Sequence, residues 1–334
     1  MAKLYVYDSY ENRMLVYNNL NENDPMPYSY GSTLSVREFR GSSNARVLWT
    51  TTRAMEAWNL TRRRYGAGIP VGYAFKRIWE GGHGTASQHY AGVAFDVGQG
   101  TSSAIRQRIH AAATATWHEQ LGRIHVEGGT DAQQEKFYTD LWHVLLGRHK
   151  INDANGDYPD YTDGRRDGAF TRDVRFHARR LPMKADGTAR FNMYNSDSFW
   201  LSQWNLNTLW GLAWPEVLDD FAACLVQYAE NGGLIPRGPN LGGYSYIMTA
   251  CPATSLIACA FQKGMLTKCD PAKAYRHIVR NHTGHGMLGS KEEIDFYERN
   301  GYFADNAGVT LEAAFQDWTV GQMALKMGKK ADYR

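Results

Sequence analysis

The spacing of apolar residues changes near residue 117 and divides the chain into two parts. In the first part, short apolar runs alternate with turn residues, a pattern that predicts short strands and helices. We expect a β-hairpin from the runs 4–7 and 14–17, a helix over 52–60 with Met55, Trp58 and Arg62 on one face, a strand at 69–73 and a helix over 103–116. These elements predict a small α+β module that covers residues 1–116.

The second part, residues 117–334, is mainly helical in its spacing. Two capping boxes, Thr130 with Gln133 and Ser290 with Glu293, mark helix starts. Further starts are expected at Pro215, Pro271 and Thr310, and the helix after Pro215 has apolar residues on one face at 218, 221, 225 and 228. Because no strand-like runs separate these helices, the pattern predicts paired antiparallel helices that form part of an (α/α) toroid.

Composition narrows the class of protein. A length of 334 residues allows two domains, and 43% hydrophobic residues supply cores for them. The net charge of +3 gives no electrostatic reason to expect nucleic acid or an anionic membrane as a partner. No window of 18 apolar residues occurs, so no membrane span is expected, and the N-terminus lacks the pattern of a Sec signal. The four cysteines show no C-x-x-C pair, and we expect Cys224, Cys251 and Cys259 to be small buried residues rather than disulfide partners.

The segment SQHYAGVAFD, residues 87–96, carries the first candidate site. Its histidine and aspartate, seven positions apart, are both ordinary zinc donors, and a catalytic zinc needs three protein ligands and an open position for water. Gly92 and Ala94 would let the backbone pack closely around an ion. His89 and Asp96 are therefore candidate zinc ligands. The alternative is a polar loop in which the two side chains only form hydrogen bonds.

The whole pattern S-x-H-x-x-G-x-A-x-D resembles that of the zinc D-Ala-D-Ala carboxypeptidases and dipeptidases. The resemblance implies that His89 and Asp96 bind zinc, that Ser87 holds a peptidoglycan peptide, and that Arg77 polarises the scissile carbonyl. The segment around Arg77 fits equally well a buried strand whose basic pair, Lys76 and Arg77, faces solvent. His118 is the candidate third ligand, although position 115 is Ala where the family has a glutamate base, and a solvated helix histidine is the other reading.

A second resemblance covers roughly residues 118–334, about two thirds of the chain. A series of peptides resembles, in order, those of glycoside hydrolase family 92, the calcium-dependent inverting exo-α-mannosidases. The series is IHVEGGT (124–130), FYTDLWH (137–143), NGGLIPR (231–237), FQKG (261–264), DPAKAY (270–275), NGY (300–302) and TLEAAFQDW (310–318).

This resemblance implies calcium and two carboxyl groups, about 6.5–9.5 Å apart, that flank the sugar. Asp317 is the candidate base; the alternative is an acidic residue favoured by the helix dipole near its start. Gln316 replaces one of two adjacent aspartates of the family, and Asn205 replaces the aspartate of its Trp-Asp pair. Trp204, Asn205 and Trp318 are the candidate substrate-binding residues.

The carboxylic acid that the resemblance requires has no clear counterpart. The loop 237–245 contains no carboxylate, and Tyr244, with an ordinary pKa of about 10, is poorly matched to protonating a glycosidic oxygen. Glu230 and Asp197 are the possible substitutes that remain.

Three hypotheses follow. The first is an α-mannosidase relative that acts on a mannose-containing glycan, with hydrolysis in question because the acid is missing. The second is a zinc D,D-peptidase that acts on peptidoglycan peptides. The third is a glycan- or wall-binding protein without either activity. All three fit a bacterial protein that stays in the cytoplasm or reaches the cell wall by a route other than Sec. The junction near 112–118 shows no Gly, Ser or Pro linker between the zinc-peptidase-like module (1–116) and the mannosidase-like segment (117–334).

Overall fold

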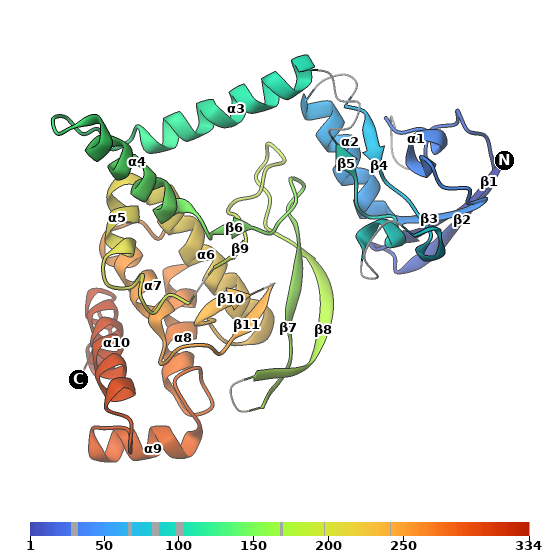
Figure 1. Ribbon diagram of the computed structural model, residues 1–334. Coiled ribbons are helices and arrows are strands. Elements are labelled where there is room, and N and C mark those ends of the chain that lie inside the picture. Colours follow the sequence, from blue (N-terminus) through green and yellow to red (C-terminus); the bar gives the residue numbers. More distant parts are fainter. Residues whose placement is uncertain are drawn as a thin grey trace. The chain divides into compact units, whose positions relative to one another are not determined.

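The structure is a computed structural model (Figure 1), which describes residues 1–27, 33–65, 69–81, 87–97, 103–167, 170–196, 198–240 and 242–333. The chain forms two compact units, Met1–Gln120 and Leu121–Arg334. We expected the spacing of apolar residues to mark a boundary near residue 117. Helix α3 (Ser103–Leu121) lies across the boundary between the two units.

A three-stranded sheet organises the first unit. Strand β1 (Ala2–Asp8) pairs antiparallel with β2 (Arg13–Leu20) and parallel with β3 (Val47–Thr51). The β1–β2 pairing confirms the predicted hairpin. Alternate residues of β1 are buried, as the period of two along a strand requires when one face covers a core.

Helices and short strands complete this unit. Helix α2 (Thr52–Tyr65) follows β3 directly, and its predicted face is buried at Met55, Trp58 and Arg62. Helix α1 (Val36–Arg40) starts at a capping box. Strand β4 (Val71–Tyr73) pairs with β5 (Asp96–Val97), and two single turns are η1 (Ile78–Glu80) and η2 (Gln88–Ala91).

The second unit is built around helix α6 (Pro215–Gly232). Its predicted apolar face is buried, and Gly233 ends the helix in a left-handed conformation. Phe221 of α6 stacks on Trp210 and Tyr194 at centroid distances of 4.9 and 4.2 Å. Helix α5 (Leu206–Ala213) packs on α6, and α7 (Pro252–Gln262) packs on α10 (Ala307–Lys326). The remaining helices are α4 (Asp131–Leu145), α8 (Pro271–His282), α9 (Lys291–Asn300) and α11 (Lys330–Tyr333).

The expectation that no strands separate the helices of this unit was wrong. A long antiparallel pair, β7 (Asp157–Asp167) and β8 (Phe170–Arg180), lies beside the short pair β10 (Gly238–Asn240) and β11 (Gly243–Ser245) in Figure 1. A further pair joins β6 (His149–Lys150) to β9 (Tyr194–Asn195). The β7 and β8 sequences are rich in Asp and Arg, so they lack the apolar alternation by which a half-buried strand is recognised.

The start of α10 also differs from the prediction. The helix begins at Ala307 rather than Thr310, because Asn306 Oδ1 accepts a hydrogen bond from the Val309 N–H at 3.1 Å. The Thr310 hydroxyl instead accepts from the N–H of Phe303 at 2.9 Å.

Two further expectations concern the cysteines and the membrane. All four cysteines are free; Cys224 and Cys251 are buried, and Cys259 and Cys269 are half-buried. Within the described residues, no helix has both the length and the apolar character that crossing a bilayer demands. The partial toroid stays a prediction.

Candidate functional site

His89 and Asp96 lie side by side in the first unit. His89 Nε2 is 3.2 Å from Asp96 Oδ1, and the buried His89 ring places Nδ1 3.0 Å from the carbonyl oxygen of Ala74. Gly92, with a φ of +68°, passes so close to the Trp49 carbonyl that a Cβ would lie 2.0 Å from that oxygen. The glycine therefore serves close packing of the backbone against β3.

The structure does not add a third zinc ligand to this pair. Over the ranges that the structure describes, no group of three or more His, Cys, Asp or Glu side chains could hold a metal ion. His118 is an exposed residue of α3 that joins no such group. The zinc site and the peptidase resemblance stay predictions.

The other predicted members of the zinc site have structural partners. Ser87 caps η2 by accepting a hydrogen bond from the N–H of His89. Arg77 pairs with Glu80, its Nη2 lying 2.6 Å from Glu80 Oε1, and its guanidinium lies over the Trp79 ring. Burial acts to raise the pKa of the Glu80 carboxyl, but hydrogen bonds from Arg77, Ser43 and Asn44 outweigh burial and lower that pKa to about 2.

The second unit brings two predicted residues together on its surface. Phe315 lies between Trp204 and Trp318, with centroid distances of 4.8 and 6.5 Å and interplanar angles of 30° and 23°. Trp204 is 53% exposed and Trp318 is 61% exposed. Phe315 and Trp318 share one side of α10 because residues three apart are neighbours on a helix. We call Trp204, Phe315 and Trp318 the aromatic shelf.

A cleft of about 310 Å³ adjoins the aromatic shelf. Phe315 and Trp318 form its aromatic wall, and its polar lining comes from α7, α10 and the segment before α5. The polar side chains are Gln203, Ser255, Gln262, Thr319 and Gln322. The lining therefore supplies amide and hydroxyl groups, and no carboxylate belongs to it among the residues that the structure describes.

Gln316, which stands where the family resemblance expects an aspartate, is fully buried. Its Oε1 accepts from the N–H of Cys251 at 2.6 Å, and its Nε2 donates to Gln203 Oε1 and Glu312 Oε2, each at 3.2 Å. Gln203 also donates to Glu312 Oε2 at 2.7 Å. The amide at position 316 thus fits a network that needs both a donor and an acceptor. Sequence reasoning missed Glu312, whose partner Gln203 is distant in sequence.

Asp317, the candidate base, is held by two neighbours. Its Oδ1 lies 2.6 Å from His282 Nδ1, and its Oδ2 accepts from the Tyr297 hydroxyl at 2.9 Å. His282 Nε2 contacts the Thr254 hydroxyl at 3.0 Å. The Thr–His–Asp order matches that of a nucleophile relay, but Thr254 is fully buried and offers substrate no access. Asp317 does not line the cleft beside the aromatic shelf.

Asn205 occupies the N-cap position of α5 without making a side-chain cap bond. Asn205 is exposed and directly follows Trp204 of the aromatic shelf in the sequence. The structure groups Trp204 and Trp318 on one surface and turns Asp317 toward α8 and α9.

Two of the three possible acids, Tyr244 and Glu230, are engaged by neighbouring groups. The buried Tyr244 hydroxyl donates to the Tyr228 carbonyl at 3.3 Å, and burial raises the pKa of Tyr244 far above its usual range. Glu230 pairs with Lys273 at 2.7 Å and with His277, and these hydrogen bonds lower the pKa of the Glu230 carboxyl. Asp197 lies outside the described residues.

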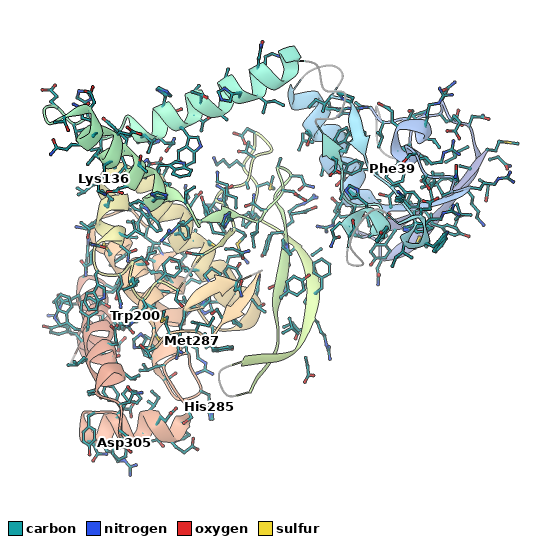
Figure 2. All side chains as sticks on the ribbon, in the orientation of Figure 1. Phe39, Lys136, Trp200, His285, Met287 and Asp305 are labelled. Atoms are coloured by element: carbon teal, nitrogen blue, oxygen red, sulfur yellow. The ribbon has the colours of Figure 1, made fainter. Side chains whose placement is uncertain are left out.

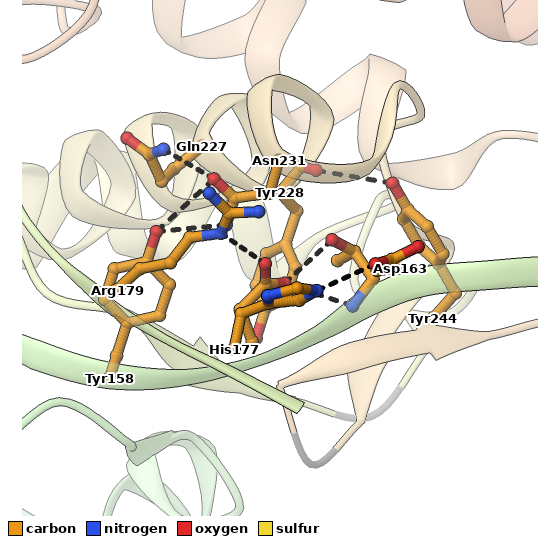
Figure 3. Close-up of polar contacts among 10 residues, drawn as sticks. Tyr158, Asp163, His177, Arg179, Gln227, Tyr228, Asn231 and Tyr244 are labelled. Atoms are coloured by element: carbon orange, nitrogen blue, oxygen red, sulfur yellow. Dashed lines mark hydrogen bonds and ion pairs between the residues drawn. The ribbon is translucent and has the colours of Figure 1, made fainter. Parts of the chain in front are cut away.

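A polar cluster joins the β7–β8 pair to the end of α6 (Figure 3). Asn231 Nδ2 donates to the Tyr158 hydroxyl at 3.0 Å, and Gln227 Nε2 donates to Asn231 Oδ1 at 3.0 Å. Asp163 and His177 form a cross-strand pair at 2.8 Å. These contacts hold the charged strands against the helix, which explains how a polar hairpin packs on this unit.

Calcium, implied by the family resemblance, was tested against the same side chains. The described part of the chain holds no group of three or more Asp, Glu, His or Cys that could bind an ion. Calcium binding stays a prediction.

Comparisons with known proteins concern the second unit. The sequence model of the glycosyl hydrolase family 92 catalytic domain matches residues 100–334, a range that includes His118. Among solved structures, the chain is similar to a family GH92 inverting mannosidase from Bacteroides thetaiotaomicron, with 24% identity and a TM-score of 0.55 over 68% of this chain and 29% of that one.

A family GH92 α-mannosidase from the same organism has 21% identity and a TM-score of 0.57, over 68% of this chain and 28% of that one. The structure of this α-mannosidase in complex with mannoimidazole has 21% identity and a TM-score of 0.57, over 68% of this chain and 27% of that one. At these identities the likeness concerns the fold, and the chain spans less than a third of the length of these structures. No curated protein matches the sequence.

Proposed function

The chain belongs to glycosyl hydrolase family 92, and on that premise we propose that it binds mannose-containing glycans on the aromatic shelf without hydrolysing them. The family relation makes it a relative of the α-mannosidases. Mannoimidazole in a solved family member supports a mannose-type ligand for that relative.

The exposure of the aromatic shelf carries the proposal. Neighbouring exposed aromatic rings form a contiguous apolar patch, and such patches mark binding sites because large aromatic side chains normally bury most of their surface. A pyranose ring has an apolar C–H face that stacks on such rings. Its hydroxyls would meet the amides of Gln262 and Gln322, each of which offers both a donor and an acceptor.

The same cleft supports binding rather than hydrolysis. Inversion requires two carboxyl groups that flank the sugar, whereas the cleft's polar lining is amide and hydroxyl. Two carboxylates on α10 already have hydrogen-bond partners. Glu312 accepts from Gln203 and Gln316. Asp317 accepts from Tyr297 and pairs with His282.

Calorimetric titration with α-1,2-mannobiose, together with chromatography of the same mixture for free mannose, tests the proposal. We expect saturable heat of binding and no release of mannose. Maltose, a glucose disaccharide, controls for unspecific stacking. Absence of binding contradicts the proposed ligand, and release of mannose at a rate proportional to protein contradicts the lack of hydrolysis.

A further inference from the structure

A second cavity, of about 430 Å³, opens in the same unit where three chain segments meet. The segments are the turn 248–250, the loop 288–289 that leads into α9, and the connection 303–306 before α10. Figure 2 labels His285 and Asp305, which lie in the two loops that flank α9. This cavity shares no lining residue with the cleft beside the aromatic shelf.

One wall of the cavity is held in an uncommon backbone conformation. Met248 and Ala250 have φ values of 69° and 54°, in the left-handed region that side chains other than glycine rarely adopt. Such conformations are strained and persist only where their surroundings fix them.

Arg237 supplies the fixing contacts. Its buried guanidinium donates to the carbonyls of Ala250 at 2.7 Å, Met248 at 2.6 Å, Tyr246 at 3.2 Å and Met287 at 2.7 Å. One side chain therefore ties the turn 248–250 to the loop before α9. The wall is preorganised, so a ligand that binds there does not have to order it.

The chemistry of the lining is amphipathic. Phe296, Phe303, Leu288 and Val309 supply apolar surface. Glu292, Glu293, Thr249 and Asn306 supply the polar groups. Glu293 closes the capping box of α9 by accepting from the Ser290 N–H at 2.7 Å, whereas Glu292 is exposed and is the carboxylate at the rim.

This lining selects among ligand classes. An anion would face two glutamates, and the cation of the lining, Arg237, directs its donors to four carbonyl groups. A purely apolar ligand would strip water from the carboxylates without replacing their hydrogen bonds. A neutral ring with hydroxyls on its edge and C–H groups on its face satisfies both halves of the lining.

We infer that this cavity is a second saccharide site, which binds a neutral pyranose with its C–H face on Phe296 and its hydroxyls on Glu292. A volume of about 430 Å³ is in the usual range for small-ligand sites and admits one or two sugar rings. The site is separate from the aromatic shelf, and either can exist without the other.

The test isolates the cavity by removing the aromatic shelf. Methyl α-D-mannopyranoside is titrated into the full chain, into Trp318→Ala, and into Trp318→Ala combined with Phe296→Ala or Glu292→Gln. We expect about two sites in the full chain and about one site in Trp318→Ala. In each double variant, the affinity of that remaining site should be at least about tenfold weaker. Glu298→Gln, an exposed glutamate of the same helix outside the cavity, is the matched control and should leave the affinity unchanged.

Charge selection gives a second readout that loss of folding would not produce. Mannose 6-phosphate should bind the Trp318→Ala chain more weakly than the neutral glycoside, and Glu292→Gln should narrow that difference.

The two proposals fail separately. Loss of all binding in Trp318→Ala, or equal affinity for both ligands, overturns the second site. One site that survives Trp318→Ala and disappears with Glu292→Gln overturns the aromatic shelf and supports the cavity.

Discussion

The carboxylate of Asp317 lies 2.6 Å from Nδ1 of His282, and this pair ties the middle of α10 to the end of α8. The imidazole is nearly buried, with 8% of its side chain exposed, whereas the carboxylate is 37% exposed. A buried imidazole that loses its partner keeps the cost of burial without the hydrogen bond. Asp317 therefore has a structural task, and the family resemblance alone pointed to a catalytic one.

Replacing Asp317 with Ala should lower the free energy of unfolding by about 1–3 kcal/mol, because His282 and the Tyr297 hydroxyl both lose their acceptor. Urea unfolding measures the change. Asp140→Ala is the control, since its partner Lys136 is exposed, and it should cost less than about 0.5 kcal/mol. Equal losses in the two variants would contradict the structural role of Asp317.

Restoring an aspartate at position 316 should not create a glycosidase. In Gln316→Asp the donor to Glu312 and Gln203 is replaced by a second carboxylate, so we expect about 2 kcal/mol of destabilisation. Unfolding curves and an assay for free mannose measure the two effects. Gln107→Asp, on an exposed position of α3, is the control. A stable Gln316→Asp variant that releases mannose would refute the network as drawn.

Glu80 should make the stability of the first unit depend on pH in the acidic range. Its folded pKa of about 2 lies below the ordinary value of 4.5, so the stabilisation is complete above pH 4.5 and is lost as pH falls toward 2. Glu80→Gln should therefore be less stable than the parent at pH 7, and the difference should shrink below pH 4.5.

Thermal unfolding across this pH range measures the difference. Glu11→Gln, whose pair with Arg13 is about 60% exposed on both sides, is the control and should show no such dependence. A gap between parent and Glu80→Gln that stays constant down to pH 2 would disprove the assignment.

His89 and Asp96 provide two donors, which is fewer than a stable zinc site needs. After dialysis against zinc and then buffer, mass spectrometry should find well under one zinc per chain. His110→Ala, an exposed histidine of α3, is the control for unspecific binding. One zinc per chain that is lost in His89→Ala would revive the peptidase hypothesis.

Local sequence signals predicted local structure well. The capping boxes at Thr130 and Ser290 and the helix start at Pro271 are present as predicted, because each depends on residues within one helical turn. The β7–β8 pair was missed because its charged side chains find partners across the two strands, as Asp163 does with His177, while the neutral Tyr158 contacts Asn231 of α6. Such pairing leaves no periodic apolar signal.

The candidate site was predictable only in part. Resemblance identified Trp204 and Trp318, and the structure joins them through Phe315. The resemblance could not reveal that Asp317 faces His282, 35 positions earlier, because such contacts depend on how helices pack. Likewise, the exposed Glu292 belongs to no sequence motif, and it becomes a candidate binding residue only because it lines the cavity.

The aromatic shelf is the central claim, and titration of Trp318→Ala with α-1,2-mannobiose tests it most directly. Loss of this stacking surface should weaken binding to the shelf at least about tenfold, which corresponds to about 1.4 kcal/mol or more and removes the shelf from the titration. Trp142→Ala, an exposed tryptophan of α4 outside the cleft, should bind as the parent does. Equal affinity in the parent, Trp318→Ala and Trp142→Ala would contradict the account.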